Sequence, residues 1–177
     1  ESRLYSSSRR TGPDGWQRFI DTGSAVDYYL VKEFTKDNDA DFYRSHYFSW
    51  NPTDVGAKFH FGPAWDFDRS AGVHTDTDAA HLYQRSPQGW YLRGTGTSSG
   101  RTNYKTHWYV QLFKDPVFKN AVKARWEEIK GEFKKAGDED VAAYVAALGV
   151  GAQNDRARWE DEPKRVIPRG SYAAEVD

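Results

Sequence analysis

Hydrophobic and polar residues alternate over a short stretch near the middle of the chain. From Lys58 to Phe61 the two phenylalanines occupy every second position, alternating with a lysine and a histidine. A period of two is typical of a β-strand with one buried face. Gly62 and Pro63 follow directly, and a proline cannot donate to a strand ladder. The pattern therefore predicts a strand at 57–61 that ends in a Gly-Pro turn.

A second aromatic stretch precedes this strand and predicts its partner. Residues 45–50 are expected to form the first strand, because residues 51–56 carry the Asn, Pro, Asp and Gly that are typical of turns. Two strands joined by a short turn form an antiparallel hairpin. We therefore expect the residues that enter the hairpin and the residues that leave it to meet at one end.

Helical spacing dominates the first and last thirds of the chain. Asp21 and Ser24 are good capping residues before apolar positions spaced by three and four, which predicts a helix that ends near Lys36. Asp115 followed by Pro116 predicts the start of another helix. The core face of this second helix is expected to carry Phe118, Val122, Trp126, Ile129 and Phe133, with further helices at 106–114, 137–150 and 152–159. The expected fold class is α+β, a small antiparallel β-hairpin packed among α-helices.

The 177 residues indicate a single domain. Residues 1–15 predict an N-terminal loop, residues 16–161 the domain itself, and residues 162–177 a polar tail. Residues 69–100 lose all periodicity and predict a long surface loop. Because the chain begins at Glu1 and contains no methionine, we expect a processed chain or a piece of a longer domain.

Composition narrows the classes of partner. The net charge of -1 provides no general attraction for nucleic acid or for an anionic membrane surface. The absence of cysteine excludes disulfides, thiolate metal sites and a cysteine nucleophile. No apolar run approaches the roughly 20 residues that span a bilayer. Aromatic residues make up 16% of the chain, so the core is expected to be aromatic, and the helices around Trp108, Trp126 and Trp159 are expected to supply part of it.

Two acidic stretches flank the predicted hairpin. Side chains alternate in an extended segment, so Asp66 and Asp68 are expected on one side of the chain, with Trp65 and Phe67 buried on the other. Two such carboxylates can bind Mg²⁺, Mn²⁺ or Ca²⁺. The alternative for an isolated Asp-x-Asp is a solvated loop. The hairpin is expected to bring this pair beside the acidic loop at 37–41.

Three stretches of the sequence carry a resemblance to a known family. They are VDYYLVKEFTKDND at 26–39, YF at 47–48 and FGPAWDFD at 61–68. Together they resemble the CotH kinase family, the spore-coat protein H type of atypical protein kinase. The last string is the most specific, because its aromatic residues and both acids match in register. The resemblance covers most of residues 16–160 and implies the C-lobe of an atypical kinase fold.

The resemblance also implies roles for individual residues. Phosphoryl transfer needs one carboxylate to orient the acceptor hydroxyl and others to hold Mg²⁺ on the nucleotide. The resemblance gives the first role to Asp39 and the second to Asp66 and Asp68, with Asn38 or Asp41 assisting a second ion. The implied cofactors are ATP and Mg²⁺, with Mn²⁺ or Ca²⁺ as alternatives.

One departure and one absence qualify this match. Asp37 stands where the family often has an asparagine, two residues before its catalytic acid. A kinase also needs a nucleotide-gripping lobe with a lysine. Nothing before Trp16 can supply that lobe, so the N-terminal half of the same domain is expected as a partner.

Three functions remain open from the sequence. The first is an ATP- and Mg²⁺-dependent phosphotransferase, a Ser/Thr protein kinase that acts on secreted or surface proteins, as the resemblance implies. The second is a non-catalytic module that Ca²⁺ stabilises and that binds a carbohydrate, a surface polymer or a protein through exposed aromatics such as Trp50, Trp90 and Tyr91. The third is a metal-dependent hydrolase. The expected location is secreted or at the cell surface.

Overall fold

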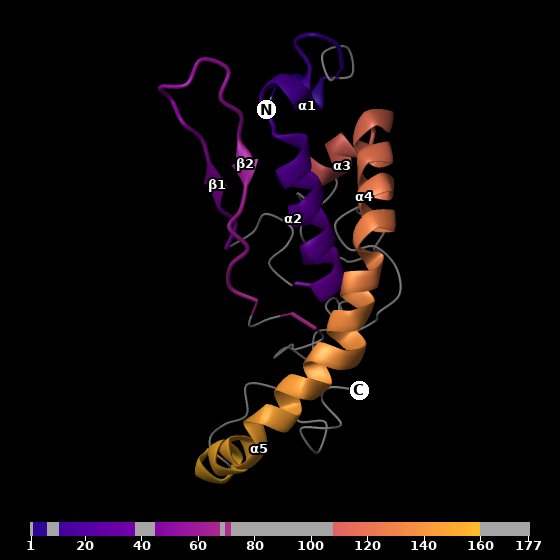
Figure 1. Cartoon of the computed structure of the whole chain (residues 1–177). Helices are drawn as coiled ribbons and strands as arrows, with labels where there is room; N and C mark the ends of the chain where they lie inside the picture. The colour runs from indigo at the N-terminus through magenta and orange to yellow at the C-terminus, as the bar shows by residue number, and fades with distance from the viewer. Residues whose placement is uncertain (1, 7–10, 38–44, 68–69, 72–107, 160–177) are drawn as a thin grey trace, which may run out of the picture.

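The computed structural model describes residues 2–6, 11–37, 45–67, 70–71 and 108–159. These residues form an α+β fold in which a two-stranded antiparallel sheet lies beside a group of helices (Figure 1). In chain order the elements are α1 (Ser2–Tyr5), the 3-10 turn η1 (Trp16–Arg18), α2 (Thr22–Thr35), β1 (Phe48–Ser49), β2 (His60–Phe61), α3 (Trp108–Leu112), α4 (Pro116–Lys135), the π-helical turn η4 (Ala136–Asp140) and α5 (Val141–Arg158). The expected fold class is confirmed at this level.

Helix α2 lies at the centre and has the predicted ends. The carboxylate of Asp21 accepts a hydrogen bond from the backbone N–H of Ser24 at 2.8 Å, which caps the first turn. After Thr35 the chain turns at Lys36, which has the left-handed conformation (φ 51°) common just past a helix end. The helix therefore ends at the predicted position.

The hairpin is confirmed, but its strands are shorter than predicted. Phe48 pairs with Phe61 and Ser49 with His60. A parallel bridge between Ile20 and Phe59 attaches the hairpin to the residues just before α2. The hairpin lies along one side of α2 (Figure 1).

Helix α4 lies along another side of α2. Asp115 caps it by accepting a hydrogen bond from the N–H of Val117 at 2.9 Å, as predicted. Near the middle of the two helices Arg125 pairs with Asp27 at 2.8 Å, and near their ends the ring centroids of Phe34 and Phe133 are 4.5 Å apart. The two helices therefore run side by side in the same direction (Figure 1).

The core between these elements is mainly aromatic, as predicted. Trp16, Tyr29, Tyr109 and Phe118 are each at most 1% exposed. Leu4 of α1 joins the same core, so the expected N-terminal loop contains a short helix that packs. The predicted core face of α4 is confirmed. Phe118 and Val122 are buried, and the later residues of this face are partly buried and pack against the core. Those later residues are Trp126, Ile129 and Phe133.

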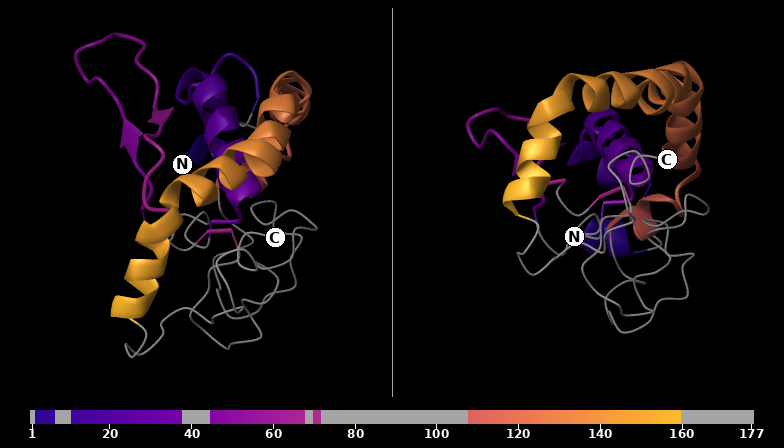
Figure 2. Two further views of the ribbon diagram at one scale, coloured as in Figure 1. Left: turned by 60° about the horizontal axis from the view of Figure 1, so that its bottom comes forward. Right: turned by 90° about the horizontal axis from the view of Figure 1, so that it is seen from below.

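The C-terminal helices differ from the prediction. The two helices expected at 137–150 and 152–159 form one element, α5, broken at Gly149 by a non-helical backbone (φ 43°, ψ -121°). Tyr144 is 73% exposed and Trp159 is 49% exposed, so the expectation that Trp159 contributes to the core is wrong. The reason is that α4 and η4 carry the chain past the end of α2, and α5 then extends away from it (Figures 1 and 2).

Candidate functional site

The turn after β2 carries the first candidate metal ligand, but its backbone is not extended. Phe61 is buried, and the chain then passes through a cis Gly62–Pro63 bond. Asp66 has φ 61°, in the left-handed region. The left-handed conformation of Asp66 means that this segment is not extended, so its side chains do not alternate as expected. Asp66 is exposed, and Asp68 lies outside the described residues.

The aromatic neighbours of Asp66 are not both buried. Trp65 is 58% exposed, so the prediction that it anchors the turn in the core is wrong. Its ring lies edge-on to the ring of Tyr47, with the two ring centroids 6.4 Å apart. Phe67 is partly buried and lies against the ammonium of Lys32, which is 4.3 Å from the ring centroid. The left-handed backbone of Asp66 accounts for the change, because it rotates its neighbours out of strict alternation.

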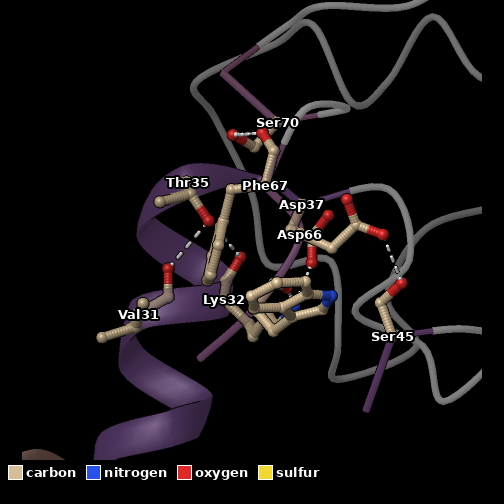
Figure 3. Close-up of polar contacts among 9 residues, drawn as sticks. Val31, Lys32, Thr35, Asp37, Ser45, Asp66, Phe67 and Ser70 are labelled. Carbon is tan, nitrogen blue, oxygen red and sulfur yellow. Dashed lines mark hydrogen bonds and ion pairs between the residues drawn. The ribbon is translucent and has the colours of Figure 1, made fainter. Parts of the chain in front are cut away.

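A buried ion pair lies beneath this turn. The ammonium of Lys32 pairs with the carboxylate of Asp37, and both side chains are fully buried. The same ammonium donates to the backbone carbonyl of Trp65 at 3.5 Å. Figure 3 shows Lys32 reaching from α2 to the point where the acidic loop begins. One side chain therefore joins the first residue of the acidic loop to the turn that carries Asp66.

Sequence reasoning missed this pair. Asp37 was expected only as a member of the acidic loop at 37–41, and its side chain is buried. The left-handed turn at Lys36 lets the N–H of Asp37 donate to the carbonyl of Lys32 at 3.3 Å, which brings the carboxylate back over α2. The signal in the sequence was a lysine on the apolar side of α2, next to the buried Tyr28 and Tyr29.

A second contact attaches the other end of the acidic segment to the same turn. The hydroxyl of Ser45 donates to Oδ2 of Asp66 at 2.8 Å (Figure 3). The described residues give Oδ1 of Asp66 no hydrogen bond. Asp37 and Ser45 are the described residues on either side of segment 38–44. Ser45 contacts Asp66 directly, whereas Asp37 is linked to Trp65 through the ammonium of Lys32.

Unusual backbone conformations gather here. Within the described ranges, the residues other than glycine with positive φ are Lys36, Ser45, Asp66 and Ala71. The N–H of Ala71 donates to the carbonyl of Thr35 at 2.6 Å, so this residue also belongs to the site. Left-handed backbone at such residues is costly, and it is concentrated at functional sites in proteins.

Tyr28 is a buried aromatic residue next to the ammonium of Lys32. It is 5% exposed, and its ring lies 5.4 Å from the ammonium of Lys32 and 5.5 Å from the ring of His46. Burial, and secondly the negative charge of Asp37, raise the pKa of Tyr28 to about 12. Its hydroxyl is therefore protonated at neutral pH, and it has no hydrogen-bond partner within the described part of the chain.

The remaining predicted site residues lie outside the described residues. These are Asn38, Asp39 and Asp41 of the acidic segment, together with Asp68. Among the residues that are described, no group of three or more His, Cys, Asp or Glu side chains could hold a metal ion. None of the described helices combines the length and apolar character needed to cross a bilayer.

Comparison with known proteins gives one match. The sequence model of the family described as CotH kinase protein matches residues 5–172, which is most of the chain. No curated protein and no solved structure matches.

Proposed function

The chain belongs to the CotH kinase family, and from this membership we propose that it is an ATP- and Mg²⁺-dependent phosphotransferase with the architecture of an atypical kinase C-lobe. The acceptor is a serine or threonine hydroxyl of a secreted or surface protein. Family membership suggests a kinase-like function. The acceptor, the nucleotide and the location belong to the proposal.

One observation carries the proposal. The described residues on either side of the acidic segment are both linked to the turn at Trp65 and Asp66. Asp37 is linked through Lys32, which pairs with its carboxylate and donates to the carbonyl of Trp65, and Ser45 is linked directly, by its hydrogen bond to Asp66. Two residues of fully extended chain reach about 7 Å at most. Because Asp39 is only two residues after Asp37, it can serve the same site as Asp66 without a long intervening loop.

The proposed roles follow from what each carboxylate can do. Asp39 orients the acceptor hydroxyl and accepts its proton. Asp66 and Asp68 hold Mg²⁺, or Mn²⁺ or Ca²⁺ in its place, and Asn38 or Asp41 assists with a second ion. The donor set fits a hard cation, because Asp66 is exposed and its Oδ1 makes no hydrogen bond to a described residue. When bound, the ion neutralises charge on the nucleotide phosphates.

The phosphates of a nucleotide also need a lysine and a covering loop. Lys32 does not suit this role, because its ammonium is buried and paired with Asp37. We therefore assign this role to a separate N-terminal lobe of the same domain, which acts as the partner of these residues.

The test uses the full-length protein and three variants. We expect Asp39→Asn to keep its affinity for Mg²⁺-ATP, measured by calorimetry, and to lose about 10²- to 10⁴-fold in transfer from labelled ATP to a mixture of serine and threonine peptides. Asp66→Asn should weaken Mg²⁺-nucleotide binding. Asp54→Asn is the control, because Asp54 lies exposed in the hairpin turn. Wild-type turnover in Asp39→Asn, or no transfer by the wild-type protein, would reject the proposal.

A second function is favoured by a different observation. Trp50 is 52% exposed and stacks on Phe59, with ring centroids 5.8 Å apart and planes 21° apart. Such an exposed flat aromatic pair suits stacking against a sugar ring. Binding of soluble oligosaccharides that is lost in Trp50→Ala, in a protein that transfers no phosphate, would favour a carbohydrate-binding module instead. Trp90 and Tyr91, the other aromatics expected for this function, lie outside the described residues.

A further inference from the structure

Lys32 is a buried charged residue to which the proposed chemistry gives no role. Its side chain and that of Asp37 are both 0% exposed. Removing a charge from water is unfavourable unless the charge is paired and hydrogen-bonded. An apolar residue at this position of α2 would avoid the problem entirely. The presence of an ion pair therefore calls for an explanation beyond burial.

The ammonium of Lys32 contacts two segments that are far apart in sequence. A lysine ammonium offers three donors and no acceptor. One donor meets Asp37, the residue directly before the acidic segment, and another is 3.5 Å from the carbonyl of Trp65, the residue directly before Asp66. The rings of Phe67 and Tyr28 lie 4.3 Å and 5.4 Å from the ammonium.

The surroundings make this group rigid. Asp37 is attached twice, through its carboxylate to the ammonium and through its N–H to the carbonyl of Lys32 at 3.3 Å. The hydroxyl and the N–H of Ser70 both contact the carbonyl of Phe67, at 2.7 and 3.1 Å (Figure 3). A group on a helix with its rotamer fixed by packing can define positions more precisely than a loop can.

We propose that Lys32 is a positioning residue, whose ammonium sets Asp37, the residue directly before the acidic segment, in register with the turn that carries Asp66. This inference rests on the proposed function. In this proposal the carboxylate of Asp37 pairs with Lys32, and the other carboxylates of the site bind the metal ion and orient the acceptor. Lys32 acts through these residues and touches no substrate.

The test separates positioning from stability. Lys32→Met alone removes the ammonium that pairs with the buried carboxylate of Asp37, so this variant is expected to unfold more readily. The double variant Lys32→Met/Asp37→Leu removes both charges and should recover stability, because a buried pair can be replaced by apolar residues of similar size. We expect the double variant to keep the wild-type KM for Mg²⁺-ATP and to lose about 10- to 100-fold in kcat. Lys130→Met is the control, because Lys130 also forms an ion pair, with Glu127, but this pair is exposed on α4.

Hydrogen exchange gives a readout that does not depend on activity. In the stable double variant, peptides that cover residues 36–45 and 64–71 should exchange faster, while peptides from α4 keep the wild-type rate. Wild-type kcat in the folded double variant overturns the proposal. If the wild-type protein transfers no phosphate, the proposed function fails instead, and unchanged exchange in these two peptides then overturns the positioning role by itself.

If the double variant does not fold, Lys32→Arg replaces it, since it keeps the charge and changes the shape of the joining group. The same loss of kcat at constant KM is expected, and wild-type kcat again overturns the proposal.

Discussion

The two carboxylate oxygens of Asp115 accept hydrogen bonds from different donors. One donor is the indole of Trp16, which is 99 positions away in the chain. The indole N–H of Trp16 donates to Oδ2 at 2.7 Å, while Oδ1 accepts the N–H of Val117 at the start of α4. Both Trp16 and Asp115 are 1% exposed. This carboxylate therefore caps α4 and fixes it to the segment that precedes α2.

Replacing Asp115 tests this double role. Asp115→Ala removes the cap and leaves a buried indole N–H without an acceptor, so we expect a loss of about 2–4 kcal/mol in the free energy of unfolding. Asp115→Asn keeps one acceptor oxygen and should lose less. Urea unfolding followed by tryptophan fluorescence measures both. Equal losses in the two variants would show that the charge, and not the number of acceptors, determines stability here.

A pair of aromatic truncations tests the position of the core. Phe118 is 0% exposed and packs against Trp16 and Phe113, so Phe118→Ala should cost about 3–5 kcal/mol. Tyr144 on α5 is 73% exposed, and Tyr144→Ala should change the free energy of unfolding by less than about 0.5 kcal/mol. A large loss for Tyr144→Ala would mean that α5 packs against a surface in solution.

The cap of α2 gives a dependence on pH. The backbone N–H of Ser24 is the main cause that lowers the pKa of Asp21 below its ordinary value of 3.8. A lowered folded-state pKa means that the stabilisation is present above the unfolded-state pKa and disappears as the pH falls through the folded-state value. Asp21→Ala should therefore cost about 0.5–2 kcal/mol at pH 7, and the difference from wild type should shrink below about pH 4. Urea midpoints at pH 7 and pH 3 measure this difference, with Asp54→Ala as the control, and a constant difference would contradict it.

The hydrogen bond from Ser45 to Asp66 tests the candidate metal site. If Asp66 binds the ion, Ser45→Ala should lower the affinity for Mn²⁺ in the presence of ATP by about 10- to 100-fold, because the hydroxyl orients the carboxylate. Ser49→Ala is a matched control in the exposed strand β1. Calorimetric titration of Mn²⁺ gives both affinities. Unchanged binding in Ser45→Ala would indicate that Asp66 is not a ligand or that its orientation does not matter.

The sequence determined the features that depend on neighbouring residues. Asp21 and Asp115 mark helix starts because capping is local, and the left-handed turn at Lys36 ends α2 where the cluster of turn formers begins. The hairpin and its turn were predictable for the same reason. The FGPAWDFD string also indicated the family to which the chain belongs.

Tertiary structure decided which side chains are buried and which charges are paired. Strict alternation predicted a buried Trp65, but the left-handed backbone of Asp66 leaves this ring exposed. The helix around Trp159 was expected to supply part of the core, but α5 extends beyond the end of α2 and Trp159 is exposed. The ammonium of Lys32 pairs with the nearby Asp37, and it also donates to the carbonyl of Trp65, which is 33 residues away in the sequence. Local patterns carry no information about such contacts, because burial depends on what the rest of the chain brings to the same place.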